Sequence, residues 1–109
     1  MRHAIIVLAL LGVLASPRPA AALTGNEFLE TCGLGAGGEA ACTYYMIGWH
    51  DAFLVAERSS KMGVCIPDEV TVGQMMKELL KYLRVNHGTR HRGTVVLTTM
   101  AMQKAWPCR

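Results

Sequence analysis

Four cysteines behind an N-terminal leader constrain this chain more than any other feature of its sequence. They are Cys32, Cys42, Cys65 and Cys108, and all of them lie within residues 23–109. An even number of cysteines in a short exported domain indicates disulfides formed in an oxidising compartment. A chain of this size buries only a modest core, so two covalent links would contribute a large share of its stability.

The leader has the three parts of a secretory signal peptide. Met1-Arg2-His3 is a basic start, residues 4–15 are an apolar run, and Ala20-Ala21-Ala22 offers small residues at a cleavage site. The alternative is an uncleaved membrane anchor, but a bilayer needs roughly 20 apolar residues and this run is shorter. We therefore predict cleavage after Ala22, a single domain over residues 23–109, and no membrane association of the mature form.

Removing the leader changes the charge of the chain. Arg2 and Arg18 leave with it, so nine basic and eight acidic residues remain, for a net charge of +1. Residues 23–76 carry two basic and seven acidic side chains, whereas residues 77–109 carry seven basic side chains and one acidic. We interpret this split as attraction between two halves of the fold, with steering of a charged partner as the alternative. Export and the lack of aromatic residues among the basic ones argue against nucleic acid.

The spacing of apolar residues predicts an all-α fold, a small bundle of about four helices with two disulfides. Thr24 with Glu27, and Thr71 with Gln74, have the spacing of a helix-capping box. The second helix is apolar on nearly all sides, which is typical of a central helix or of one that supplies a partner surface. The expected helices cover residues 25–32, 39–58, 72–85 and 94–105.

Two local expectations concern the glycine-rich stretch and the last helix. Residues 33–38 should interrupt regular structure between the first two helices. In the last helix, Val95, Thr99, Met102 and Trp106 fall on one face, and Val96 and Met100 flank that face. The methionines should mostly fill gaps in the core, with a methionine groove for a partner as the alternative.

Four cysteines allow three pairings, and helix geometry separates them. Cys32 ends the first helix and Cys42 lies near the start of the second. An antiparallel hairpin of the last two helices would bring Cys65, before one, beside Cys108, after the other. We therefore predict Cys32–Cys42 and Cys65–Cys108, which contribute roughly 2.7 and 4 kcal/mol in a chain-entropy model.

The sequence offers candidate chemical groups, but none has the pattern of an active site or a metal site. His50 and Asp51 are neighbours in a helix, so they point about 100° apart and cannot form a dyad. We expect Asp51 to be buried and satisfied by a nearby donor. His87 and His91 are four residues apart but lie in a polar turn with no third ligand in sight. We predict no catalytic residue, no metal and no cofactor.

An ordered set of short motifs resembles the Rap/Tai immunity proteins of bacterial type VI secretion. The resemblance extends over nearly all of residues 23–109. Its strongest parts are a C-I-P motif and a terminal W-P-C, each built around a cysteine. In order, the motifs are Leu23-Thr24-Gly25-Asn26, Phe28-Leu29 and Cys32, Cys42 with Tyr45, Gly48 and Asp51, Cys65-Ile66-Pro67, Val72-Gly73-Gln74, Lys81-Tyr82-Leu83 and Ala105-Trp106-Pro107-Cys108.

This resemblance implies a periplasmic, all-helical protein that is not an enzyme and blocks the active-site cleft of a cell-wall amidase effector. It also implies a homodimer. The family often has a proline after the third helix, where this chain has Asn86-His87-Gly88. Because cognate pairs diverge at their interface, no contact residues are transferred, and the partner-binding residues remain open. The exposed loops 59–64 and 86–93 are candidates, and Arg90 and Arg92 could complement an acidic rim.

Two other function classes remain open. A small periplasmic acid-stress chaperone would also be helical and disulfide-bonded, and His50, His87 and His91 could act as its protonation triggers. Another exported helical binding protein would share the same features. An enzyme is the third reading, and hydrolase activity that responds to His50→Ala would support it.

Overall fold

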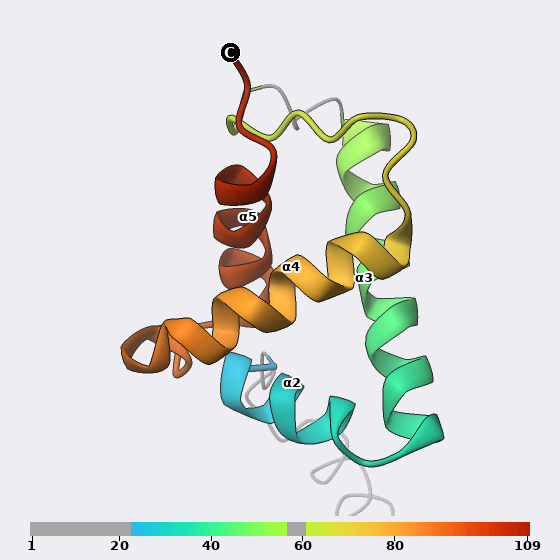
Figure 1. Cartoon of the computed structure of the whole chain (residues 1–109), viewed down its shortest axis with the longest axis vertical. Helices are drawn as coiled ribbons and strands as arrows, with labels where there is room; N and C mark the ends of the chain where they lie inside the picture. The colour runs from blue at the N-terminus through green and yellow to red at the C-terminus, as the bar shows by residue number, and fades with distance from the viewer. Residues whose placement is uncertain (1–22, 57–60) are drawn as a thin grey trace, which may run out of the picture.

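The computed structural model describes residues 23–56 and 61–109, and every regular element in these ranges is a helix (Figure 1). The leader, residues 1–22, lies outside the described residues. The all-α prediction is confirmed. The elements are α2 (Gly25–Cys32), α3 (Ala36–Ala56), α4 (Val72–Val85), the short 3-10 helix η1 (His87–Thr89) and α5 (Thr94–Ala105).

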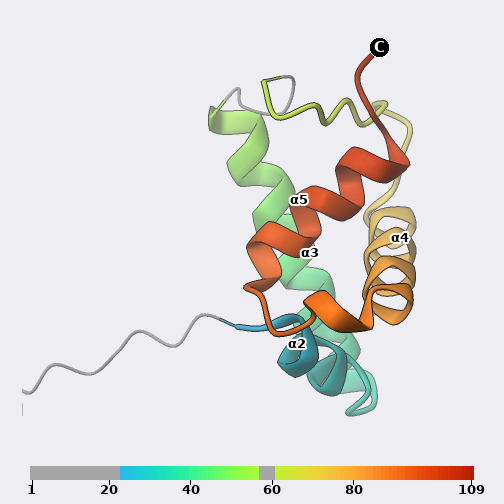
Figure 2. The same ribbon diagram turned by 90° about the vertical axis from the view of Figure 1, so that its left-hand side faces the viewer.

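Helix α4 holds the bundle together. It lies across α3 and α5 and packs against both, while α2 packs mainly against α3 at one end (Figures 1 and 2). Residues 61–71 cross the opposite end and meet the end of the chain there, where Val64 and Pro107 form an antiparallel bridge. The middle of the bundle is therefore enclosed by α4, whereas the far sides of α3 and α5 face outward.

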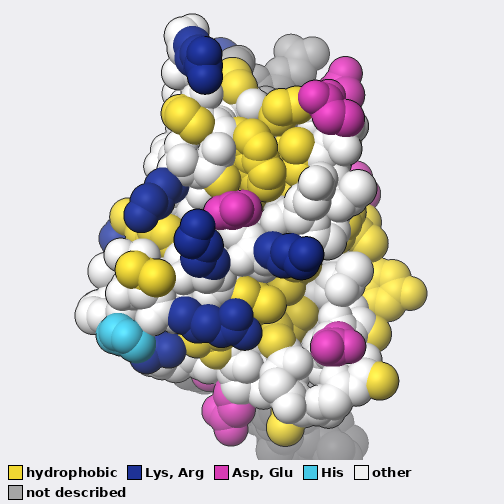
Figure 3. Space-filling view, in the orientation of Figure 1, with side chains coloured by type: hydrophobic (Ala, Val, Ile, Leu, Met, Phe, Trp, Pro, Cys, Tyr) yellow, Lys and Arg dark blue, Asp and Glu magenta, His cyan; other side chains and the backbone are white. Residues whose placement is uncertain are grey.

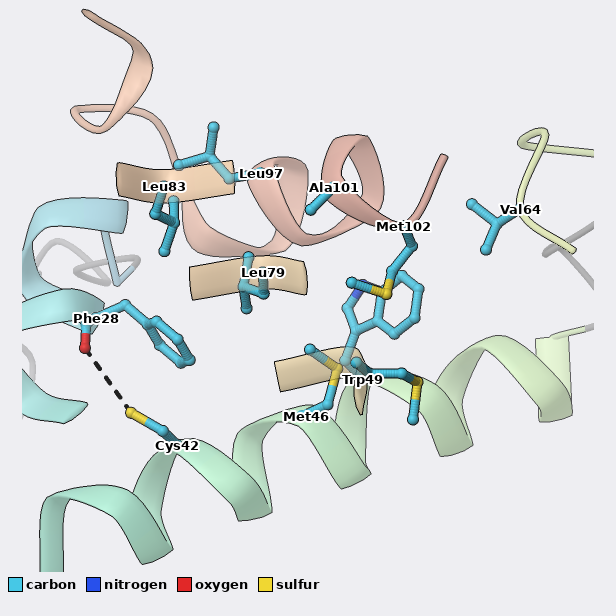
Figure 4. Close-up of a cluster of buried hydrophobic side chains, with 11 residues drawn as sticks. Phe28, Cys42, Met46, Trp49, Val64, Leu79, Leu83, Leu97, Ala101 and Met102 are labelled. Atoms are coloured by element: carbon cyan, nitrogen blue, oxygen red, sulfur yellow. Dashed lines mark hydrogen bonds between the residues drawn. The ribbon is translucent and has the colours of Figure 1, made fainter. Parts of the chain in front are cut away.

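The core lies where the four helices meet (Figure 4). Its largest side chains are almost completely buried, and the aromatic ones pair with neighbours on α3. The rings of Phe28 and Tyr45 meet edge to face at 5.1 Å, and those of Trp49 and Phe53 stack at 4.1 Å. The fully buried apolar residues are Phe28, Met46, Val64, Met75, Leu79, Leu83, Leu97 and Met102.

Side-chain caps fix the starts of α2 and α4. At α4 the box is complete: the Gln74 N–H donates to the Thr71 hydroxyl at 3.2 Å, and the Thr71 N–H donates to the Gln74 amide oxygen at 2.7 Å. At α2 only half of it forms. Thr24 accepts from the Glu27 N–H at 3.2 Å, and its hydroxyl donates to the Glu27 carboxylate at 2.9 Å. Both helices begin where the capping pattern predicts.

The predicted start of α3, residue 39, was wrong by three residues: the helix begins at Ala36. Part of the glycine-rich stretch is therefore helical. The turn is confined to residues 33–35, where Gly35 has a φ of 79°. Gly38 is helical, and a Cβ there would overlap the carbonyl oxygen of Thr31. Glycine is therefore needed at this position for α3 to pack closely against the end of α2. The last two residues of the predicted helix, 57–58, lie outside the described residues.

Both predicted disulfides are present and use all four cysteines. The Cα atoms of Cys32 and Cys42 are 5.7 Å apart, and those of Cys65 and Cys108 are 5.0 Å apart. Backbone bonds accompany the second disulfide. The Cys65 N–H donates to the carbonyl of Trp106 at 2.9 Å, and the Cys108 N–H to that of Gly63 at 3.3 Å. The last turn of the chain is thus joined to the segment before α4.

Candidate partner-binding groove

An apolar groove of about 660 Å³ lies between α3 and α5. This volume falls within the usual range for a ligand pocket, roughly 300–1,000 Å³. The groove runs along the side of α5 that α4 does not cover, and only two of its lining side chains, Arg92 and Gln103, are strongly polar. We call it the α3–α5 groove. Its lining residues are Ala52, Phe53, Met62, Arg92, Val95, Val96, Thr99, Met100 and Gln103.

The wall from α5 exists because this helix turns its valines outward. Val95 is 58% exposed and Val96 is 40% exposed, whereas Met102, which helical spacing places on the same face as Val95, is fully buried. Thr94 and Thr98 are buried instead, at 2% and 0% exposure. The Thr98 hydroxyl donates to the carbonyl of Thr94 at 2.8 Å, which satisfies its donor within the helix and allows it to be buried.

One rim of the groove comes from the segment before α4. The Gln103 side-chain amide donates to the carbonyl of Met62 at 2.6 Å, across 41 positions of sequence. Two residues further on, Val64 is fully buried, and Cys65 begins the disulfide to the end of the chain. These contacts fix Met62 in place beside α5.

The opposite rim comes from Arg92, just before α5. Its backbone carbonyl accepts a bond from the Gly25 N–H at 3.1 Å, which anchors it to the start of α2. Its guanidinium donates to the sulfur of Met100 at 3.6 Å, and the Tyr82 hydroxyl donates to the same sulfur at 3.9 Å. A thioether is a weak acceptor and a guanidinium has five N–H donors, so Arg92 retains donors for an acidic group.

The two arginines of the 86–93 turn, Arg90 and Arg92, have different contacts. The Arg90 guanidinium lies 2.6 Å from Nδ1 of His87, and the Arg90 carbonyl accepts from the Asn26 N–H at 2.9 Å. Arg90 therefore holds its own turn together, whereas Arg92 borders the groove. The two loops proposed as contact candidates thus contribute Met62 and Arg92 to opposite rims of one surface. The α5 residues between them were not predicted from the sequence.

The other candidate residues are not brought together. His50 is half-buried, but Asp51 is exposed, so the expectation of a buried carboxylate was wrong: the outer side of α3 faces solvent. His87 and His91 are both exposed. Within residues 23–56 and 61–109, no three His, Cys, Asp or Glu side chains are grouped as metal ligands would be. Among the same residues, no helix is both long and apolar enough to cross a bilayer.

Part of the basic half of the sequence gathers on one face of the molecule. Lys and Arg side chains gather over α4 and α5 on the face shown in Figure 3. A shallower hollow of about 330 Å³ lies between these helices, and Lys81, Tyr82, Lys104 and Trp106 help to line it. The exposed carboxylates of α2 and α3 belong to Glu27, Glu30, Glu39 and Asp51.

The sequence was compared with models of known protein families. A model described as Rap1a immunity proteins matches residues 24–108, which include all four helices, both disulfides and both rims of the groove. The chain belongs to this family. Membership in the Rap1a family confirms the resemblance seen in the C-I-P and W-P-C motifs, and it implies a protein partner. Comparison of this Rap1a-family chain with curated proteins and with solved structures gave no match.

Proposed function

We propose that this chain is a periplasmic immunity protein that binds and blocks a peptidoglycan amidase effector of type VI secretion, without catalysis of its own. The family match over residues 24–108 supports the immunity role. The two disulfides support export, because such bonds persist in oxidising compartments. We further propose that residues 1–22 are removed as a signal peptide, leaving residues 23–109 as the functional domain.

We propose that the effector binds in the α3–α5 groove, and the shape and lining of this groove support the proposal. Apolar walls can bury a side chain of the effector, and Arg92 can pair with a carboxylate beside it. Protein interfaces combine such an apolar centre with a polar rim. Gln103 fixes one rim and the contact with Gly25 fixes the other, so the groove is shaped before the partner arrives.

Co-expression with the product of a neighbouring toxin-like gene tests the function. The effector is directed to the periplasm, and cells carrying this chain should survive while control cells lyse. The two proteins should also elute together in gel filtration. The mass of the protein recovered from the periplasm should correspond to a chain that begins at Leu23. Absence of both protection and a complex would remove the immunity role.

A matched pair of variants tests the groove. Val96→Glu places a charge in the groove, and Val85→Glu places the same charge on a valine at the end of α4 that is 65% exposed. Burying an unpaired charge is costly, so we expect Val96→Glu to weaken the complex at least about tenfold. Val85→Glu should bind as the parent does. Equal binding by both variants would move the contact surface elsewhere and leave the immunity role standing.

One observation favours the chaperone class as a second candidate. Tyr44 is 73% exposed and Val55 is 86% exposed, and such apolar surface could bind unfolded chains. Suppression of aggregation at acidic pH, lost on replacing His50, His87 and His91, would support this reading. Unchanged compactness on acidification would exclude it. The homodimer implied by the resemblance does not depend on either function. The mass of the mature chain in solution tests it directly.

A further inference from the structure

The hollow of about 330 Å³ between α4 and α5 is separate from the groove proposed for the effector. Among the described residues, the two linings have none in common, and they lie on roughly opposite sides of α5. We call this second site the lysine hollow. Its polar and aromatic lining residues are Glu78, Lys81, Tyr82, Asn86, Lys104 and Trp106.

Two of the motifs behind the family resemblance meet at the lysine hollow. One contributes Lys81 and Tyr82, and the other contributes Trp106. The fold uses the two aromatic residues. The Tyr82 hydroxyl donates to the sulfur of Met100 at 3.9 Å, and the Trp106 carbonyl accepts from the Cys65 N–H at 2.9 Å. Lys81 is exposed, so packing in the core does not account for it.

The lysine hollow has cationic groups on both of its walls. Lys81 comes from α4 and Lys104 from α5, and both side chains are exposed. Lys77 and Arg84 are also exposed on α4, so the electrostatic field around the hollow is positive. A ligand that binds here should therefore carry a net negative charge.

The same lining also contains hydrogen-bond acceptors. Glu78 is half-buried and lies one turn before Lys81 on α4. The Asn86 side-chain amide donates to the Tyr82 carbonyl at 2.8 Å, which orients it and leaves its oxygen as an acceptor. A purely anionic ligand such as phosphate would be repelled by the Glu78 carboxylate. A ligand that also has an amine would instead find a partner there.

We infer that the lysine hollow binds a short peptide that carries several free carboxylates and a free amine. Lys81 and Lys104 pair with carboxylates, and Glu78 pairs with the amine. Hydrogen bonds between charged groups of this kind are about twice as strong as those between neutral groups. Tyr82 and Trp106 add the aromatic surface that is usual in ligand pockets.

The size of the hollow and the chemistry of the cell wall indicate where such a peptide would come from. At about 330 Å³ the hollow is near the lower limit for ligand pockets, so it suits a few amino-acid residues. Hydrolysis of an amide bond consumes one water and yields one carboxylate and one amine. Fragments of wall stem peptides released by an amidase have these groups on one short chain. The wall as the source rests on the proposed function, whereas the ligand chemistry rests on the hollow alone.

The test uses the oxidised mature chain, residues 23–109, and titrates it by calorimetry with the stem tripeptide L-Ala-γ-D-Glu-meso-diaminopimelate. We expect Lys81→Ala/Lys104→Ala to raise the dissociation constant about tenfold, because both carboxylate contacts are lost. Lys61→Ala/Lys77→Ala is the matched control, since it removes two charges from exposed positions that do not line the hollow. The control should bind within about twofold of the parent. All of these side chains are exposed, so circular dichroism should be unchanged.

Modified ligands test the role of Glu78. Acetylation of the amines of the tripeptide should weaken its binding to the parent about fivefold, because Glu78 then faces no cation. Glu78→Gln should bind the free and the acetylated tripeptide equally. The α-linked peptide L-Ala-L-Glu-L-Lys distinguishes the two sources of this chemistry. Stronger binding of the stem tripeptide supports a wall fragment, and equal binding supports acidic peptides in general.

Three results would overturn the inference. The first is no binding of the stem tripeptide at millimolar concentration. The second is an equal loss of affinity in the two double lysine variants, which would indicate a basic surface without a site. The third is binding of inorganic phosphate or of the acetylated tripeptide as tightly as the free tripeptide. Protection of cells without peptide binding overturns this inference alone, and peptide binding without protection overturns the proposed function alone.

Discussion

Helices α3 and α4 share one core, yet their outer faces differ. Leu79 of α4 and Met46 of α3 are both fully buried. Opposite the core, α4 presents Lys81 to solvent, whereas α3 presents Tyr44 and Gly48. A helix with one apolar face is explained by the fold that buries it. In a helix that is apolar on both sides, packing in the core accounts for only one of the two apolar surfaces. On α3 the other surface lies beside the groove.

The largest expected loss of stability follows removal of a disulfide, and the two disulfides should differ in how much they contribute. Cys65→Ala/Cys108→Ala opens a loop with a sequence separation of 43, and Cys32→Ala/Cys42→Ala opens one with a separation of 10. The chain-entropy model gives losses of roughly 4 and 2.7 kcal/mol. Urea unfolding of the two double variants measures both. The reverse order would mean that the anchor at the start of α3 contributes more than its loop length accounts for.

The inner faces should prove equivalent. Met46→Ala and Leu79→Ala each remove a fully buried side chain, so each should lower the free energy of unfolding by about 2–5 kcal/mol. Val55→Ala, on the exposed outer side of α3, should change the free energy of unfolding by less than about 0.5 kcal/mol. Denaturant unfolding with both disulfides intact gives all three values. A loss below about 1 kcal/mol for Met46→Ala would show that α3 is not part of the common core.

Two glycines of α3 should respond in opposite directions. Gly48→Ala should raise the free energy of unfolding of the dilute chain by up to about 1 kcal/mol, because alanine favours the helix. In a domain of this size that is roughly 4–8 °C in Tm. Gly38→Ala should lower Tm, since its Cβ would overlap the Thr31 carbonyl. Thermal melts of both variants provide the comparison, and a loss of stability in Gly48→Ala would mean that the fold itself needs this glycine.

The smallest effect concerns Tyr45, on the inner side of α3. Burial raises the pKa of the Tyr45 phenol above 10.0, and a hydrogen bond with Thr98 partly opposes the shift. The folded chain then holds this proton more tightly than the unfolded chain. This stabilising contribution is present below about pH 10 and is lost as the pH rises through the raised pKa. Tyr45→Phe should remove this part of the alkaline decline in Tm, and an unchanged decline would assign it to other groups.

The sequence predicted α4 and α5 to the residue because their signals are local. A capping box starts α4, apolar residues recur along it, and Pro107 follows the end of α5. The start of α3 could not be predicted in this way. Position 38 can belong to the helix only as glycine because Thr31 of another helix lies against it, and that contact exists only in the folded chain.

The groove was harder to predict than the helices. It is assembled from α3, α5 and two loops, and the bond between Gln103 and Met62 joins residues 41 apart. The loops could be named because polar and glycine-bearing segments are usually exposed. Helical spacing places Val95 and Met102 on one face, but Met102 is buried and Val95 is exposed, because the burial of each residue depends on which neighbouring helix covers it.

The positions of the two disulfides also determine how the molecule would bear mechanical load. A pull between Leu23 and Cys108 would cross from Cys32 to Cys42 and from Cys65 to Cys108 through sulfur. Between those points the tension would run along α3, while α4 and α5 would lie in a closed loop that carries none of it. The helix with two apolar faces is therefore also the one stretch of long helix that such a force could extend.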